Sequence, residues 1–349
     1  MIDPHVHLRD WNQKDKETLV HGLGVAKKAG INHVFDMPNT DPPITSREKV
    51  LDRLSYAKEV IKENFKTMQY SVYMGITQDK DQIAEAVRTY NELFPLVIGL
   101  KLFLGHSTGN MGLITLEEQR KVMYELKDYT GVLVVHAEKE EFCDNSLFDI
   151  KNPKTHLVAR PRKAEVESIK DIIALIKEVN FKGTLHIAHL TTKEGLDIIL
   201  KERENGLFIS FGITPHHALL CIDDADDYLL KMNPPLKEKE DRDALFNYLL
   251  SDGFTFIESD HAPHTAEDKL NGASGIPGFM SNLLLIKKLR ENGMSREREL
   301  DLTTYNCSKV FNLEYSEESP VANIDKKINS LVNEYPFNAY KSYMDNLDK

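Results

Sequence analysis

The sequence has little cysteine, no excess of positive charge and no long apolar run. Its three cysteines, Cys143, Cys221 and Cys307, are far apart and form no CxxC motif, which is typical of buried thiols in a reducing compartment. Asp and Glu (55) outnumber Lys and Arg (44), for a formal charge of −11. A broad phosphate-binding face is therefore not expected, and nucleic acid is excluded as the expected partner.

Signals for membrane insertion and secretion are also missing. No stretch approaches the ~18 apolar residues of a membrane span, and residues 1–5 show neither the basic nor the apolar region of a signal peptide. We expect a soluble, cytoplasmic protein that does not bind membranes. Its 41% hydrophobic and 28% charged residues are ordinary globular usage and exclude disordered and collagen-like classes.

Short apolar runs alternate with amphipathic stretches along most of the chain. This rhythm predicts eight strands, each followed by a helix. The expected strands cover residues 2–8, 33–37, 69–73, 96–102, 132–136, 184–189, 207–211 and 254–259, and the expected helices cover residues 14–29, 46–63, 82–93, 116–129, 164–179, 192–204, 241–251 and 279–291. Eight repeats without a GxGxxG turn after the first strand favour a closed (β/α)8 TIM barrel over an open doubly wound sheet.

The alternation of strands and helices stops near Leu313. We therefore assign residues 1–313 to the barrel and residues 314–349 to a helical or irregular C-terminal tail. Gly30 is expected to end the first helix, and Thr45 with Glu48 to form a capping box at the start of the second.

Side chains that can bind metal stand at the ends of several expected strands. His5 and His7 are two residues apart on the first strand, so their imidazoles share one face. His136 and His189 end the fifth and sixth strands, and Asp260 follows the eighth. The carboxyl ends of barrel strands meet at one mouth. Four neutral imidazoles and one carboxylate suit zinc or a similar divalent ion, with an open position for water.

Lys101 lies near the end of the fourth strand, where an ammonium group would repel bound cations. Two interpretations remain open. The amine could react with carbon dioxide to form a carbamate, whose two anionic oxygens could bridge two metal ions. Otherwise Lys101 is an ordinary strand-end lysine that forms a salt bridge or extends toward solvent.

Three further segments have weaker signals. His216 and His217 follow the seventh strand and are expected to be structural or to orient a ligand. His186 precedes His189 by three residues, which predicts that it lies on the opposite face of its strand and packs against a helix. Residues 106–110 are expected either to fold over a bound substrate or to form an ordinary loop.

Together these motifs resemble the dihydroorotase branch of the amidohydrolase superfamily. The segments that carry the resemblance are DPHVHLRD (3–10), MPNT (37–40), KLF (101–103), VHAE (135–138), AHLTT (188–192), TPHH (214–217), NPPL (233–236) and SDHAPH (259–264). They run in order from residue 3 to about residue 313. The resemblance implies a metal-dependent barrel that interconverts N-carbamoyl-L-aspartate and L-dihydroorotate in pyrimidine biosynthesis.

The resemblance also implies roles for individual residues. The implied ligands of one or two zinc ions per subunit are His5, His7, Lys101, His136, His189 and Asp260. The first two histidines would bind the first ion, the last two the second, and carbamylated Lys101 would bridge them. In the hydrolytic direction a hydroxide between the metals attacks the ring carbonyl. Asp260 is the catalytic acid and base and protonates the leaving nitrogen.

Substrate recognition is assigned in the same way. The implied substrate-binding residues are Arg9, Asn39, Asn233 and His264. The planar guanidinium of Arg9 suits the substrate carboxylate, and by resemblance it separates this chain from hydantoinase-like relatives. The alternative for Arg9 is a surface ion pair with Asp10 or Asp36.

Two other functions remain open, another cyclic amidohydrolase (an allantoinase or a dihydropyrimidinase) and an inactive scaffold homologue. Related enzymes usually carry a small accessory β domain built from segments before the first strand and after the last helix. Here the HxH pair begins at residue 5 and the tail shows no alternating strands. The accessory domain is therefore expected to be reduced or absent. A small-molecule substrate is the expected partner, and a homodimer is the assembly left to test.

Overall fold

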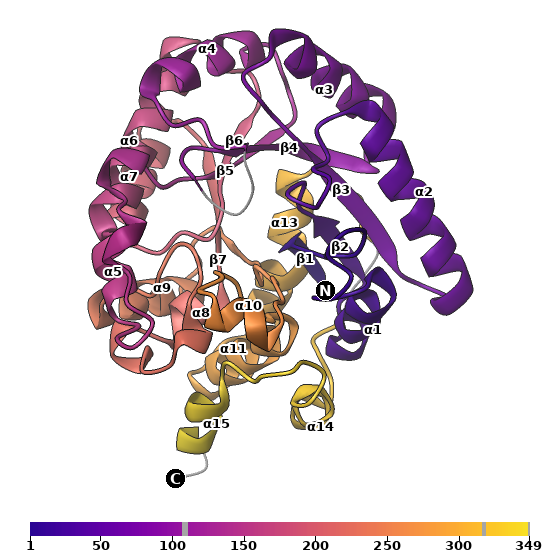
Figure 1. Ribbon diagram of the computed structural model, residues 1–349, viewed down its shortest axis with the longest axis vertical. Helices are drawn as coiled ribbons and strands as arrows, with labels where there is room; N and C mark the ends of the chain where they lie inside the picture. The colour runs from indigo at the N-terminus through magenta and orange to yellow at the C-terminus, as the bar shows by residue number, and fades with distance from the viewer. Residues whose placement is uncertain (107–110, 316–318, 348–349) are drawn as a thin grey trace.

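The computed structural model describes residues 1–106, 111–315 and 319–347, and its centre is a barrel of eight parallel strands (Figure 1). The strands are neighbours in chain order: β1 (Ile2–Val6), β2 (His33–Asp36), β3 (Gln69–Gly75), β4 (Val97–Phe103), β5 (Val132–His136), β6 (Thr184–Ile187), β7 (Ile209–Ile213) and β8 (Phe256–Ile257). The ring closes where His7 N donates to His261 O at 2.7 Å and Val6 pairs with His261. The predicted TIM barrel is confirmed.

Helices surround the barrel (Figure 1). The helices that alternate with the strands are α1 (Leu19–Ala29), α2 (Arg47–Asn64), α3 (Lys80–Leu93), α4 (Leu116–Leu126), α6 (Arg162–Glu178), α7 (Lys193–Glu204), α9 (Lys239–Leu250) and α11 (Phe279–Glu291). Shorter helices are α5 (Thr155–Ala159), α8 (Pro215–Leu219), α10 (Ala266–Leu270), α12 (Arg296–Leu300) and α13 (Asn306–Val310). Among the residues that the structure describes, no helix is long and apolar enough to cross a membrane.

Helix ends follow local signals, although not always at the predicted residue. Gly30 ends α1 with a φ of 95°, a left-handed conformation that glycine adopts without strain. The predicted cap of the second helix is wrong by one residue, because Ser46 caps α2 by accepting a hydrogen bond from Lys49 N at 3.2 Å.

Aromatic rings fill part of the interior of the barrel. Phe311 directly follows α13, and its ring lies 5.1 Å from the ring of Phe35, 6.1 Å from Tyr73 and 6.4 Å from Phe256. This layer closes the interior of the barrel, so the functional site is expected where the carboxyl ends of the strands open.

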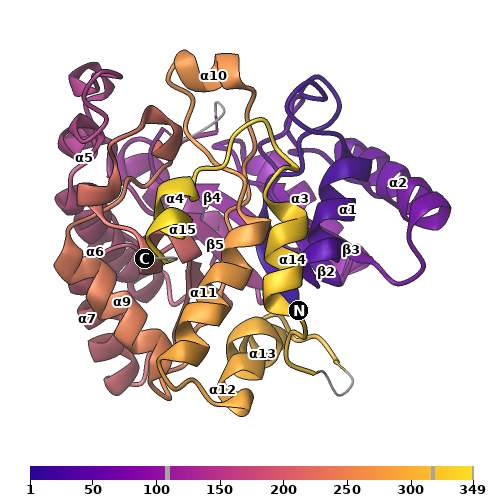
Figure 2. The same ribbon diagram turned by 90° about the horizontal axis from the view of Figure 1, so that it is seen from below.

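The chain after the barrel packs against the side of the molecule. α14 (Ile324–Leu331) lies beside α1 and α11 and buries Ile324, Ile328 and Leu331, and α15 (Lys341–Leu347) follows (Figure 2). Within the described ranges, every strand belongs to the one barrel sheet.

Candidate active site

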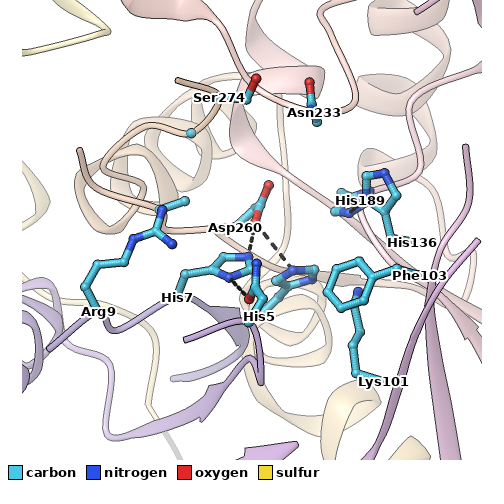
Figure 3. A pocket seen from close by; sticks show the side chains of 13 residues that line it. His5, His7, Arg9, Lys101, Phe103, His136, His189, Asn233, Asp260 and Ser274 are labelled. Carbon is cyan, nitrogen blue, oxygen red and sulfur yellow. Dashed lines mark hydrogen bonds and ion pairs between the residues drawn. The ribbon is translucent and has the colours of Figure 1, made fainter. Parts of the chain in front are cut away.

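A pocket opens at the carboxyl ends of the strands (Figure 3). Every predicted site residue lines this pocket except His264, whose Nε2 lies 3.1 Å from Nη2 of Arg9, a lining residue. Residues from both ends of the chain therefore meet, as the barrel geometry requires. Of the segment 106–110, expected to be either a substrate lid or an ordinary loop, residues 107–110 lie outside the described residues.

The first cluster is formed by His5, His7 and Asp260. Asp260 Oδ1 lies 3.4 Å from His5 Nε2 and 3.0 Å from His7 Nε2, and one ligand atom from each residue falls within a group 4.8 Å across. Burial raises the pKa of Asp260, but His5 and His7 outweigh it and hold the pKa below its ordinary value. The carboxylate is ionised, and the three side chains converge as ligands of one cation would.

Asn39 orients one member of this cluster. The Nδ1–H of His7 donates to Asn39 Oδ1 at 2.6 Å, which leaves the Nε2 lone pair directed at Asp260 and the pocket. Asn39 thus orients the ring of His7. It also lines the pocket, where the sequence analysis predicted that it binds substrate.

The second cluster contains His136 and His189. His136 Nδ1 lies 3.0 Å from His189 Nε2, and the ring of His189 lies 5.2 Å from that of His5, so the two clusters adjoin. Burial lowers the pKa of both His136 and His189 below the ordinary value. Both imidazoles are therefore neutral, which is the form that binds metal.

Glu138 and Arg160 support this second cluster, and the sequence analysis assigned no role to either. His136 Nε2 donates to Glu138 Oε2 at 2.9 Å, and Arg160 donates to the same oxygen from Nε at 3.0 Å and Nη2 at 2.7 Å. Although burial opposes it, Arg160 and His136 hold the pKa of Glu138 well below its usual range. Glu138 follows His136 by two residues, a spacing that could have signalled a shared face. No comparable signal marks Arg160.

Lys101 is fully buried beside both clusters. Burial lowers the pKa of Lys101 to about 8, and its Nζ has no hydrogen-bond partner among the described residues. The same holds for Nδ1 of His5 and of His189. Orphaned polar atoms around two sets of ligand atoms fit a site for one or two divalent ions.

Arg9 occupies the other end of the pocket from Lys101 (Figure 3). Its Nε donates to Pro263 O at 3.1 Å and its Nη2 to His264 Nε2 at 3.1 Å, and only 2% of Arg9 is exposed. The alternative of a surface ion pair is therefore wrong. Asp36 is instead paired with Nη2 of Arg53 at 2.7 Å.

The prediction for His186 is wrong, whereas that for His217 is confirmed. The ring of His186 stacks on Phe256 at 5.0 Å, and its Nε2 lies 3.3 Å from Glu258 Oε2, inside the barrel. β6 ends at Ile187, and His189 has a φ of 38°. The strand alternation that placed His186 therefore does not reach His189. His217 has a structural role, since its Nε2 donates to Pro234 O at 3.0 Å.

Eight parallel strands with histidines and an aspartate at their carboxyl ends define an amidohydrolase-type barrel. No family model matches the chain. Dihydroorotase of Archaeoglobus fulgidus is 30% identical over 328 residues, which cover 92% of this chain and 74% of the relative. Dihydroorotase of Halobacterium salinarum is 32% identical over 321 residues, 90% of this chain and 72% of the relative. The chain belongs to the dihydroorotase family.

Other relatives are more similar in sequence but longer than the matched region. Dihydroorotase of Pyrococcus horikoshii is 38% identical over 296 residues, and the match covers 84% of this chain but 61% of the relative. Thus the chain spans less than two thirds of that protein.

Solved structures support the fold. An L-hydantoinase (dihydropyrimidinase) from Arthrobacter aurescens superposes with a TM-score of 0.80 at 22% identity, covering 92% of this chain and 73% of the other. Dihydroorotase from Saccharomyces cerevisiae in complex with 5-fluoroorotic acid superposes with a TM-score of 0.73 at 21% identity, and the match covers 90% of this chain and 85% of the other.

Proposed function

We propose that this chain is a dihydroorotase, which interconverts N-carbamoyl-L-aspartate and L-dihydroorotate in pyrimidine biosynthesis. The observation that carries the proposal is the buried Arg9 guanidinium, held by Pro263 and His264 in the same pocket as the two ligand clusters. A buried guanidinium suits a substrate that carries a carboxylate. Dihydrouracil and allantoin lack that group, so this residue argues against the other cyclic amidohydrolases.

The donor set supports zinc as the cofactor. His5, His7 and Asp260 would hold one ion and His136 and His189 the other, with carbamylated Lys101 as the bridge. The buried amine with a pKa near 8 supports this modification, because a neutral amine is the form that adds to carbon dioxide. When bound, such ions polarise a carbonyl oxygen and make water a better nucleophile.

Asp260 moves the proton. Because its pKa is depressed, its carboxylate is ionised at neutral pH and begins the hydrolytic direction as a base. It accepts a proton from the attacking water and passes it to the ring nitrogen as the amide bond breaks. In the synthetic direction Asp260 takes the proton from the carbamoyl nitrogen, and the same groups act in reverse order.

Arg9 and Asn233 lie on different sides of Asp260 (Figure 3), and both would contact the substrate. Arg9 binds the carboxylate, and burial lowers the pKa of His264 to about 3, so this neighbour adds no competing positive charge. His156 Nε2 donates to Asn233 Oδ1 at 2.9 Å, which fixes the orientation of the Asn233 amide toward the pyrimidine ring.

A substrate panel tests the proposal. Zinc-loaded protein should consume L-dihydroorotate, followed by ultraviolet absorbance, and leave dihydrouracil and allantoin unchanged. Arg9→Met should lower kcat/KM by about 100-fold, equivalent to about 3 kcal/mol, because a charge-assisted contact is lost. Its zinc content should not change. Arg47→Met is the matched control, since Arg47 forms an exposed ion pair with Glu92.

Each alternative has its own outcome in this panel. Turnover of dihydrouracil or allantoin without dihydroorotate would identify another cyclic amidohydrolase. Protein that binds no zinc in the presence of bicarbonate and turns over none of the three compounds would be a scaffold homologue.

The cellular setting follows from composition. We propose a cytoplasmic protein that binds neither nucleic acid nor membranes, and the support is three free cysteines and a net charge of −11. A homodimer is proposed as the assembly to be tested, and the composition does not bear on it. Light scattering should give twice the chain mass of 39.9 kDa. A mass equal to one chain would overturn the dimer.

A further inference from the structure

Two loops form the wall of the pocket that faces the histidine clusters. Asn233 belongs to the loop that precedes α9, and Ser274 and Gly275 belong to the loop between α10 and α11. Figure 3 shows Asn233 and Ser274 on the same side of Asp260. The loops are also joined directly, because Gly275 N donates to Lys231 O at 3.0 Å.

Lys269 of α10 lies behind this wall and has no exposed surface. Its Nζ donates to the backbone oxygens of Lys231 at 2.8 Å, Ala273 at 3.0 Å and Gly275 at 3.0 Å. An ammonium group has three N–H donors, and here each reaches a different carbonyl. The side chain therefore ties the Asn233 loop to the Ser274 loop.

The contacts lead from Lys269 to the group that would bind the substrate carboxylate. Ser274 O lies 3.1 Å from His264 Nε2, and the same His264 atom lies 3.1 Å from Arg9 Nη2. Because His264 Nε2 accepts from Arg9, Ser274 O packs against His264 without a hydrogen bond, and a shift of the Ser274 loop would change the packing around the partner of Arg9. Asn233 is two residues from Lys231, so the other loop would shift with it.

A purely structural role would not require a charge at this position. Burial of an ammonium is costly, and it lowers the pKa of Lys269 to about 7. An apolar side chain of similar length would fill the space at lower cost, but it would leave three carbonyls without a donor. What the ammonium adds is a fixed geometry for three backbone atoms of the pocket wall.

We propose that Lys269 is a positioning residue that fastens the Asn233 and Ser274 loops together and thereby sets the affinity for substrate. This inference rests on the proposed function. Errors of about 1 Å in the placement of binding groups are enough to weaken binding or catalysis strongly. Lys269 does not touch the reacting atoms, so its removal acts on binding more than on the proton transfer at Asp260.

The test compares Lys269→Met, which keeps the length and removes all donors, with Lys269→Gln, which keeps two N–H donors. The control is Glu267→Gln, an exposed residue on the same helix. We expect Lys269→Met to raise KM for L-dihydroorotate about tenfold and to change kcat by less than about threefold. Lys269→Gln should fall between wild type and Lys269→Met, and the control should match wild type.

Amide hydrogen exchange provides a readout that does not depend on activity. In Lys269→Met, exchange should accelerate in residues 231–236 and 271–276 and stay unchanged in the strands. An unchanged KM would overturn the proposal. So would exchange that accelerates throughout the chain while kcat falls and KM rises together. If Lys269→Met does not fold, the same comparison is made with Lys269→Gln. If the wild-type protein does not turn over dihydroorotate, the proposed function fails. Unchanged exchange in the two loops of Lys269→Met would separately refute the role of Lys269 in fastening them.

Discussion

Replacement of Glu138 by Gln probes the second ligand cluster most directly. Glu138 is fully buried, and a single carboxylate oxygen accepts hydrogen bonds from His136 and from two nitrogens of Arg160. The substitution keeps the size and one acceptor oxygen but removes the charge. Arg160, only 1% exposed, then remains as a buried cation without its anion.

Two magnitudes follow from this geometry. Breaking a buried ion pair from one side costs about 3–5 kcal/mol of unfolding free energy. The loss of a carboxylate that orients a metal-binding histidine typically lowers metal affinity by about 10–100-fold. Both effects should appear in Glu138→Gln, because the same oxygen serves Arg160 and His136. The zinc affinity of the first cluster should stay near wild type, since Glu138 contacts neither His5 nor His7 in the described structure.

The assay separates the two effects. Urea unfolding of metal-free protein measures stability, and competition with a chelator measures the affinity of each zinc equivalent. Glu178→Gln is the matched control, because Glu178 forms an exposed pair with Arg120 and should cost less than about 1 kcal/mol. If Glu138→Gln binds both zinc equivalents as tightly as wild type does, Glu138 does not orient a ligand and our account of the second cluster is wrong.

Three further predictions concern other parts of the chain. Lys101→Ala should lose one zinc equivalent and most activity in metal analysis and turnover assays, and short carboxylic acids should restore part of both; full activity would exclude the carbamate. Tyr335→Phe should lower the unfolding free energy by about 1–3 kcal/mol in urea, because the Tyr335 hydroxyl donates to the buried Glu17 at 2.7 Å. Burial lowers the pKa of His33 from 6.5 to about 3, so below pH 6.5 the unfolded chain binds the proton first. The contribution of His33 to the unfolding free energy should therefore decrease as the pH falls from 6.5 toward 3, by up to about 1.4 kcal/mol per pH unit, and His33→Gln should reduce the measured slope by about that amount.

The sequence predicted what depends on strand order. In a barrel, residues at the carboxyl ends of strands converge whatever their separation along the chain. His5, His136 and Asp260 could therefore be brought together without knowledge of any contact. The same reasoning failed for His186, since it assumed regular alternation up to His189, where the backbone turns into a left-handed conformation.

What the sequence did not predict are contacts set by loops. Arg160 reaches Glu138 from 22 residues away, and Lys269 reaches Lys231 from 38 residues away. Neither spacing corresponds to a helix turn or a strand repeat, so no periodicity marks these pairs. Such residues position the side chains that belong to the motifs, and their contacts become visible only in the folded structure.

The charges of the site explain how an acidic protein could receive the anionic substrate that we propose. Glu258 and Asp260 are both buried, and their histidine neighbours hold both pKa values below the ordinary range, so the site carries two negative charges. A carbamate on Lys101 would make about three, and two divalent ions would exceed that by about one positive charge. Arg9 then adds a second positive charge in a pocket of low dielectric, where it acts strongly over short distances. Removal of two divalent ions would take about four positive charges out of the pocket, so it should weaken substrate binding as well as turnover, even with Arg9 in place.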